Sequence, residues 1–153
     1  MTQEDFIKVL DEKGISYEME GDKIVVIDVK GIMENVILDH IKTLPPNVKF
    51  MNSGEVDLEE VLKIPKGIIF ENGDNVSLDS LKILNNGVKF NNKGIVWLQS
   101  VKTIHPGVEF HNGKVNMERI IGGLGWFDQW SGNIEGISSN RLLNLMISKG
   151  VFI

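Results

Sequence analysis

The residues of this chain that most often carry chemistry are few and scattered. Its three histidines are His40, His105 and His111, and it has no cysteine. The histidines lack the spacing of metal ligands, and no HExxH pattern is present. Without cysteine there is no thiolate nucleophile, thiolate metal site or disulfide framework. We therefore expect neither a metal site nor a cofactor.

Two further segments invite a chemical interpretation. The glycine-rich run 122–125 lacks the Lys-Ser/Thr of a phosphate loop and the strand-helix spacing of a dinucleotide-binding motif. Asp128 lies between Phe127 and Trp130, but the sequence places no second carboxylate beside it. No set of nucleophile, base and orienting residue emerges, so we expect no catalytic residues and no enzyme activity.

The elements that must position the remaining side chains repeat every twenty residues. Phenylalanine recurs at this step, and an asparagine follows each one two residues later: Phe50, Phe70, Phe90 and Phe110, then Asn52, Asn72, Asn92 and Asn112. Valine and leucine columns keep the same step, among them Val56, Val76 and Val96 with Leu58, Leu78 and Leu98. A period of this length predicts a stacked repeat protein, which builds surfaces more readily than pockets.

Each part of the repeat has a local interpretation. The Val-x-Phe and Val-x-Leu phrases place both apolar side chains on one face of a short strand. The spacing Leu58-x-x-Val61-x-x-Ile64 suits a tight helical or 3₁₀ turn. Gly or Asn in the third position of turns such as 65–67 fits a positive φ. For the asparagine column we favour an internal hydrogen-bond ladder over a ligand site.

Both ends of the chain are predicted to be caps, which a solenoid needs because its terminal coils are otherwise exposed. Residues 1–35 begin with a capping signal, Thr2 followed by Asp5, and then a helical stripe. A hairpin is expected around Gly21-Asp22. Residues 121–153 are predicted to contain a helix from about 140 to 149, packed on the last coil. A protruding hydrophobic helix that binds a partner is the alternative.

The run Leu58-x-x-Val61-x-x-Ile64-Pro65-x-x-Ile68 resembles the Leu-x-x-Leu-x-x-Leu-Pro phrase of short bacterial leucine-rich repeats, which also have a twenty-residue period. The whole unit is also similar to repeat arrays in hypothetical proteins of bacteria and bacteriophages. This resemblance covers about residues 36–120 and implies a noncatalytic interaction protein. The Phe-x-Asn phrase is one residue tighter than in leucine-rich repeats, and a second strand follows it. A curved horseshoe and a regular β-solenoid with two strands per coil both stay open.

The predicted fold is therefore a mainly β, leucine-rich-repeat-like solenoid of short parallel strands, forming a single domain over residues 1–153. An N-terminal helix and hairpin cap (1–35) precedes about four repeats (36–120), and a helical cap (121–153) follows them. The apolar stretches are too short to span a membrane, and no leader opens the chain. We expect a soluble, cytoplasmic protein.

Charge is distributed unevenly along the chain. Residues 1–40 contain 4 Lys and 10 Asp or Glu, whereas residues 41–120 contain 10 basic and 9 acidic residues. Phosphate-backbone binding needs basic clusters, so we expect no direct contact with nucleic acid. The acidic N-terminal segment could meet a basic partner, including a nucleic-acid-binding groove, or it could be a solvated face that keeps the solenoid end soluble.

The binding candidates are outward-facing residues of the Val-x-Leu strands and their flanks. Trp97 beside Ile95 interrupts a polar face, and tryptophan is enriched at binding hot spots. Packing of a cap segment such as 126–127 over Trp97 is an equally open alternative. The remaining candidates are the acidic rim and a weaker apolar position on the other strand: Glu55, Asp57, Glu59 and Asp79, and Ile69.

These observations predict a noncatalytic protein-binding solenoid whose partner is another protein. The resemblance and the small, acidic chain suggest a phage-encoded inhibitor of a host defence enzyme. The alternative is a structural or self-assembling component, for which homo-oligomers are expected.

Overall fold

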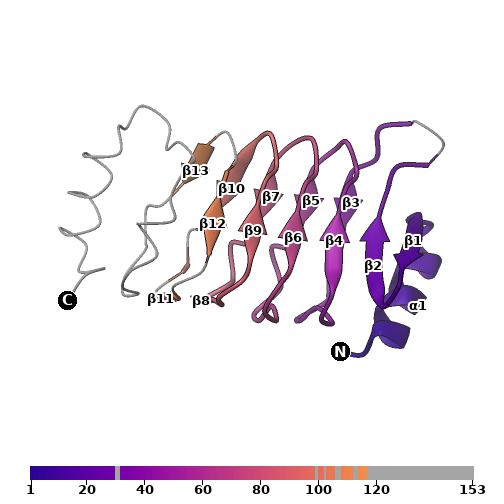
Figure 1. Ribbon diagram of the computed structural model, residues 1–153, viewed down its shortest axis with the longest axis horizontal. Coiled ribbons are helices and arrows are strands. Elements are labelled where there is room, and N and C mark those ends of the chain that lie inside the picture. The colour runs from indigo at the N-terminus through magenta and orange to yellow at the C-terminus, as the bar shows by residue number, and fades with distance from the viewer. Residues whose placement is uncertain (30–31, 99, 102, 106–107, 112–113, 117–153) are drawn as a thin grey trace.

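Each twenty-residue repeat folds into one coil, and successive coils pair through parallel strands to form a β-solenoid of about four turns (Figure 1). The computed structural model describes residues 1–29, 32–98, 100–101, 103–105, 108–111 and 114–116. Within these ranges the coils stack in one direction along the long axis. A helix and a hairpin cover the N-terminal end.

Two main sheets run along the solenoid. The first sheet contains, in spatial order, β1 (Tyr17–Glu20), β2 (Lys23–Val26), β4 (Val48–Phe50), β6 (Ile69–Phe70), β9 (Lys89–Phe90) and β12 (Glu109–Phe110). The second sheet contains β3 (Val36–Ile37), β5 (Val56–Asp57), β7 (Val76–Ser77), β10 (Ile95–Trp97) and β13 (Lys114–Asn116). Only the β1–β2 pair is antiparallel among the strand pairs that the structure describes.

A third face completes each coil. The short strands β8 (Ile83–Leu84) and β11 (Thr103–Ile104) pair there, and Thr43 forms an isolated bridge with Lys63. The predicted tight turn precedes this face, since the Val61 N–H donates to the Leu58 carbonyl at 3.0 Å. The chain then extends instead of continuing as a helix, because the backbone of this segment bonds to the neighbouring coil.

The phenylalanine column forms the centre of the core. Phe50 and Phe70 stack with ring centroids 5.2 Å apart, and Phe70 and Phe90 with centroids 5.1 Å apart. All three rings are fully buried, and Val56, Val76 and Val96 line the core from the opposite sheet. The predicted buried column is thus confirmed for three members, while the Phe110 side chain lies outside the described residues.

The asparagine column is the predicted structural ladder. Asn52, Asn72 and Asn92 are buried at the ends of the first-sheet strands. Each side-chain amide donates to a backbone carbonyl of its own coil and to one of the preceding coil, as Asn92 does to Gly94 at 3.2 Å and to Asp74 at 3.1 Å. The ladder therefore joins side chains to backbone and not asparagine to asparagine.

The turn and N-terminal cap predictions are confirmed. Asn47, Gly67 and Gly87 have positive φ values of 59°, 77° and 75° at the third position of their turns. Helix α1 (Gln3–Lys13) starts with a reciprocal capping box between Thr2 and Asp5 and buries Phe6 and Leu10 against the first coil. The predicted C-terminal helix lies outside the described residues.

The structure decides between the two architectures that the sequence left open. Strands on both main sheets and on the third face pair from coil to coil, which is the arrangement of a regular β-solenoid. The Phe-x-Asn phrase explains the difference from the leucine-rich-repeat pattern. Only residues 51–55 connect β4 to β5, so a short link and no longer crossing segment joins the two sheets.

Candidate binding groove on the second sheet

A shallow groove of about 290 Å³ crosses the outer side of the second sheet. Strand register places Asp57, Ser77 and Trp97 next to one another in a row across β5, β7 and β10. The valines beside them, at positions 56, 76 and 96, point into the core. Because a small serine stands between two larger side chains, the row is hollow at its centre.

We call this feature the acidic groove, after the residues that line it: Glu55, Val56, Asp57, Asn75, Ser77, Asp79 and Trp97. Four of the predicted binding residues meet there, namely Glu55, Asp57, Asp79 and Trp97. The sequence also placed Ser77 and Asn75 on this face, but we did not predict them as site residues. The small size of Ser77 within an otherwise larger row is the signal that could have revealed the hollow.

Asp79 is the least satisfied carboxylate of the acidic groove. Its Oδ2 accepts a 3.4 Å hydrogen bond from the Ser77 hydroxyl, while its Oδ1 is shielded from solvent and has no partner among the described residues. Burial raises the pKa of Asp79; the Ser77 hydrogen bond opposes this rise, and the nearby charge of Asp57 adds to it. A cationic group entering the groove would stabilise the ionised form.

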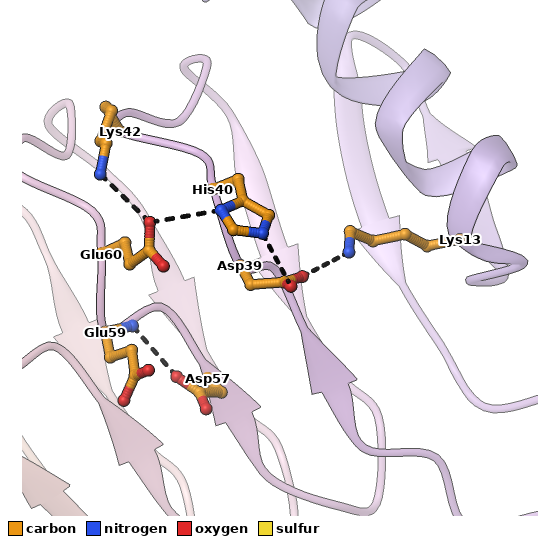
Figure 2. Close-up of polar contacts among 7 residues, drawn as sticks. All are labelled: Lys13, Asp39, His40, Lys42, Asp57, Glu59 and Glu60. Carbon is orange, nitrogen blue, oxygen red and sulfur yellow. Dashed lines mark hydrogen bonds and ion pairs between the residues drawn. The ribbon is translucent and has the colours of Figure 1, made fainter.

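Asp57 is held more firmly. Its Oδ1 accepts a hydrogen bond from the Glu59 backbone N–H at 3.0 Å, which fixes the carboxylate at the edge of the groove (Figure 2). At the equivalent position of the next coil, the Ser77 hydroxyl contacts Asp79. Two carboxylates thus converge on the hollow from adjacent coils, and the half-exposed indole of Trp97 bounds it on the next.

This combination of groups suits a positively charged side chain. Carboxylates form strong charge-assisted hydrogen bonds with Arg and Lys. An indole face attracts the same cations through its quadrupole, and it favours Arg in particular.

Three predicted site residues lie outside the acidic groove. Glu59 is exposed next to it, and only its backbone contacts Asp57. Ile95 begins β10, is half-buried, and donates its N–H to Asn75 Oδ1 at 2.8 Å. Ile69 belongs to β6 in the first sheet, so it cannot share a surface with Trp97. The predicted packing of 126–127 over Trp97 falls outside the described residues.

Lysines and acidic residues occupy alternating ten-residue segments of the repeats. Segments 41–50, 61–70 and 81–90 contain six lysines and no acidic residue, and segments 51–60 and 71–80 contain seven acidic residues and no lysine. The two sets meet where Lys42 pairs with Glu60 and Lys49 with Glu71. The four acidic residues in or next to the groove, Glu55, Asp57, Glu59 and Asp79, form no ion pair among the described residues. Their uncompensated negative charge favours a positively charged partner.

His40 takes part in an exposed ion-pair chain near the N-terminal end. It lies 3.4 Å from Asp39 and 3.8 Å from Glu60, and these two carboxylates also pair with Lys13 and Lys42 (Figure 2). The chain connects α1 to the first two coils. Across the part of the sequence that the structure describes, no group of three or more His, Cys, Asp or Glu residues is placed to hold a metal ion.

Within the described ranges, no helix has the length and apolar character needed to cross a membrane. No protein family, curated protein or solved structure matches the sequence significantly.

Proposed function

We propose that this chain is a noncatalytic protein-binding solenoid that recognises a basic surface of another protein through the acidic groove. The supporting observation is that two carboxylates of adjacent coils and the Trp97 indole converge on one hollow. Asp79 in particular has a shielded carboxylate oxygen that a cationic side chain would satisfy. The groove would thus receive Arg or Lys side chains of the partner.

The acidic residues around the groove support the same proposal. Glu55, Asp57, Glu59 and Asp79 concentrate negative charge on two adjacent coils, which suits a basic surface such as the nucleic-acid-binding groove of a nuclease. Inhibition of a host defence enzyme by a small acidic protein in the cytoplasm is the specific form of this proposal. Its motivation is the similarity to repeat arrays of bacteria and bacteriophages.

Affinity capture followed by measured binding tests the proposal. The full chain is used to capture proteins from a bacterial lysate, and the dissociation constant of each purified partner is measured. For a Trp97 hot spot, Trp97→Ala should weaken binding by about 2 kcal/mol or more. Asp57→Lys should mainly slow association and weaken its salt dependence.

The matched controls are Glu12→Lys, which makes the same charge change at an exposed position of α1, and Met51→Ala, which truncates an exposed apolar side chain elsewhere. Both should bind like the parent. A partner that binds Trp97→Ala and Asp57→Lys normally would place the interface on another face. Unfolding of Trp97→Ala would instead assign Trp97 to the core, and circular dichroism reports that outcome.

A self-assembling component is the second candidate function. Lys63, Lys66 and Lys82 form no ion pair among the described residues, and they could pair with the carboxylates of the acidic groove on a second copy. Sedimentation of the purified chain over a range of concentration and salt tests this: association that disappears at high salt supports assembly, and a monomer throughout excludes it.

A further inference from the structure

The third face contains a larger, apolar groove of about 780 Å³, separate from the acidic groove. Its apolar wall is formed by Leu62, Ile64, Pro65 and Ile83. Leu62 and Ile83 remain 50% and 48% exposed, although they are large aliphatic side chains. Contiguous exposed apolar surface of this kind marks interaction sites on soluble proteins.

Lysines alternate with these apolar residues. Leu62 and Lys63 of one coil correspond to Lys82 and Ile83 of the next. Each apolar side chain therefore has a lysine both beside it in the chain and at the equivalent position of the neighbouring coil. Lys66 lies one turn further along, and no acidic residue occurs in segments 61–70 or 81–90. We call the feature the lysine-flanked groove.

The lysines around this groove form no ion pairs within the described part of the chain. Three other lysines of the repeats pair with carboxylates: Lys42 with Glu60, Lys49 with Glu71, and Lys89 with Glu109. Among the described residues, Lys63, Lys66 and Lys82 form no ion pair. The free positive charge of this side is therefore concentrated at the apolar surface.

Backbone pairing is also interrupted at the groove. The Leu62 N–H donates to the Lys42 carbonyl at 2.8 Å, but the equivalent bond from Lys82 to Leu62 is absent within the described part of the chain. The Asn85 side chain instead donates to the Ile64 carbonyl at 2.8 Å. The Lys82 N–H and the Leu62 carbonyl thus lack the backbone bond that a continuous ladder would supply.

We infer that the lysine-flanked groove is a second protein-docking surface, and that its occupant is an acidic segment of a partner protein carrying large apolar side chains. The apolar side chains would fill the space between Leu62 and Ile83, and carboxylates would pair with Lys63, Lys66 and Lys82. The lysines without ion pairs favour an acidic occupant, because carboxylates and lysines form charge-assisted hydrogen bonds. The concave shape also suits a protruding segment better than a flat bilayer.

A peptide-selection experiment tests this inference with the full chain. Random peptides from a display library are enriched on the parent protein and depleted on a Leu62→Ser/Ile83→Ser variant. Peptides that depend on the groove should combine several acidic residues with at least one large apolar residue. In fluorescence polarisation, Lys63→Glu/Lys82→Glu should weaken the synthesised peptides by about tenfold or more, since two charge pairs become repulsive.

Matched variants separate the groove from general effects of charge and hydrophobicity. Lys8→Glu/Lys93→Glu makes the same charge change at exposed lysines elsewhere, and Met19→Ser/Met51→Ser removes apolar side chains of similar exposure. Both controls should bind the peptides like the parent. Circular dichroism confirms that every variant is folded.

Other results would overturn the inference. Absence of groove-dependent peptides, or selected peptides without acidic residues, would contradict an acidic protein partner. Co-sedimentation with phosphatidylserine vesicles that Leu62→Ser/Ile83→Ser abolishes would assign the surface to membranes. Self-association abolished by the same variant would assign it to a second copy of the chain. None of these results depends on the acidic groove, so they are distinct from failure of the proposed function.

Discussion

Asn72 shows how single buried side chains connect the coils. Its amide nitrogen lies 3.1 Å from the Gly54 carbonyl of the preceding coil, and 3.0 Å and 3.1 Å from the Asp74 and Asn75 carbonyls of its own. The residue is fully buried, so solvent cannot replace these bonds. The ladder thus stabilises a turn and a coil-to-coil contact with one group.

Substitution of this residue should be costly. Asn72→Ala removes the donor to the Gly54 carbonyl of the preceding coil, whereas the Asp74 and Asn75 carbonyls keep bonds from Asn92 and Val56. We therefore expect a loss of about 1–3 kcal/mol in the free energy of unfolding. Urea denaturation of Asn72→Ala beside Asn91→Ala, which changes an exposed asparagine of the next repeat, measures the difference. Equal midpoints would show that the ladder contributes little to stability.

Asp79 provides a pH-dependent prediction. Its folded-state pKa is raised by burial, against the Ser77 hydrogen bond and with help from Asp57, so the folded state holds the proton more tightly than the unfolded state. The associated stability is present at low pH and is lost as pH rises through the folded-state pKa. Ionised Asp79 therefore destabilises the fold at neutral pH.

Asp79→Asn should accordingly melt at a higher temperature than the parent at pH 7. The difference should shrink as the pH falls below the ordinary carboxyl pKa of about 4, because the parent is then protonated as well. Thermal denaturation across this pH range measures it, with Asp74→Asn as an exposed control. A difference independent of pH would contradict the role of ionisation.

At the scale of elements, the links between the two sheets decide how closely coils approach. A Cβ atom on Gly73 would lie 2.3 Å from the Ser53 carbonyl oxygen, and one on Gly94 would lie 2.3 Å from Asn75 Oδ1. The contact at Gly73 is with backbone, which cannot rotate away. Glycine is needed there because of the neighbouring coil.

Gly73→Ala should therefore separate two coils and cost about 1–3 kcal/mol or more, as overpacking in a well-packed interior does. Gly67→Asn is the matched control, because nothing lies within 4 Å of its position and asparagine tolerates its positive φ of 77°. Chemical denaturation of both variants provides the measurement. A Gly73→Ala protein as stable as Gly67→Asn would show that the coils adjust without cost.

At the scale of the whole molecule, stability depends on covering the exposed end coil. Helix α1 inserts Phe6 and Leu10 into the same core as Ile24 and Val26 of β2. Edge strand β1 carries Glu18 and Glu20, which are exposed and oppose edge-to-edge pairing. The N-terminal segment thus covers the apolar end of the core and places charged side chains on the exposed edge strand.

Deletion of residues 1–14 should expose the apolar end of the solenoid and cause association or aggregation beyond that of the full chain. Light scattering coupled to size exclusion measures the mass of each species. Lys13→Ala, which removes only the ion pair with Asp39, should behave like the parent. A truncated chain of unchanged mass and cooperative melting would show that the helix is not a required cap.

The repeat period by itself determined the solenoid, its buried phenylalanine and valine columns, and the positive-φ turns. It could do so because stacked coils place equivalent residues in equivalent environments. The same residue type recurring down a column therefore indicates the environment of that position. The capping box of α1 was equally readable, since its contacts are only three residues apart. The outward direction of Asp57, Ser77 and Trp97 followed from strand alternation alone.

Only the tertiary structure decided how these columns meet. Strand register placed the small Ser77 side chain between Asp57 and Trp97, which forms the hollow of the acidic groove. It also left one Asp79 oxygen shielded and without a partner among the described residues. The register also formed the lysine-flanked groove where the third face, as far as the structure describes it, lacks a backbone bond between two coils. These features depend on the distance and offset between neighbouring coils, which arise from packing across twenty residues and are not encoded in the spacing within one repeat.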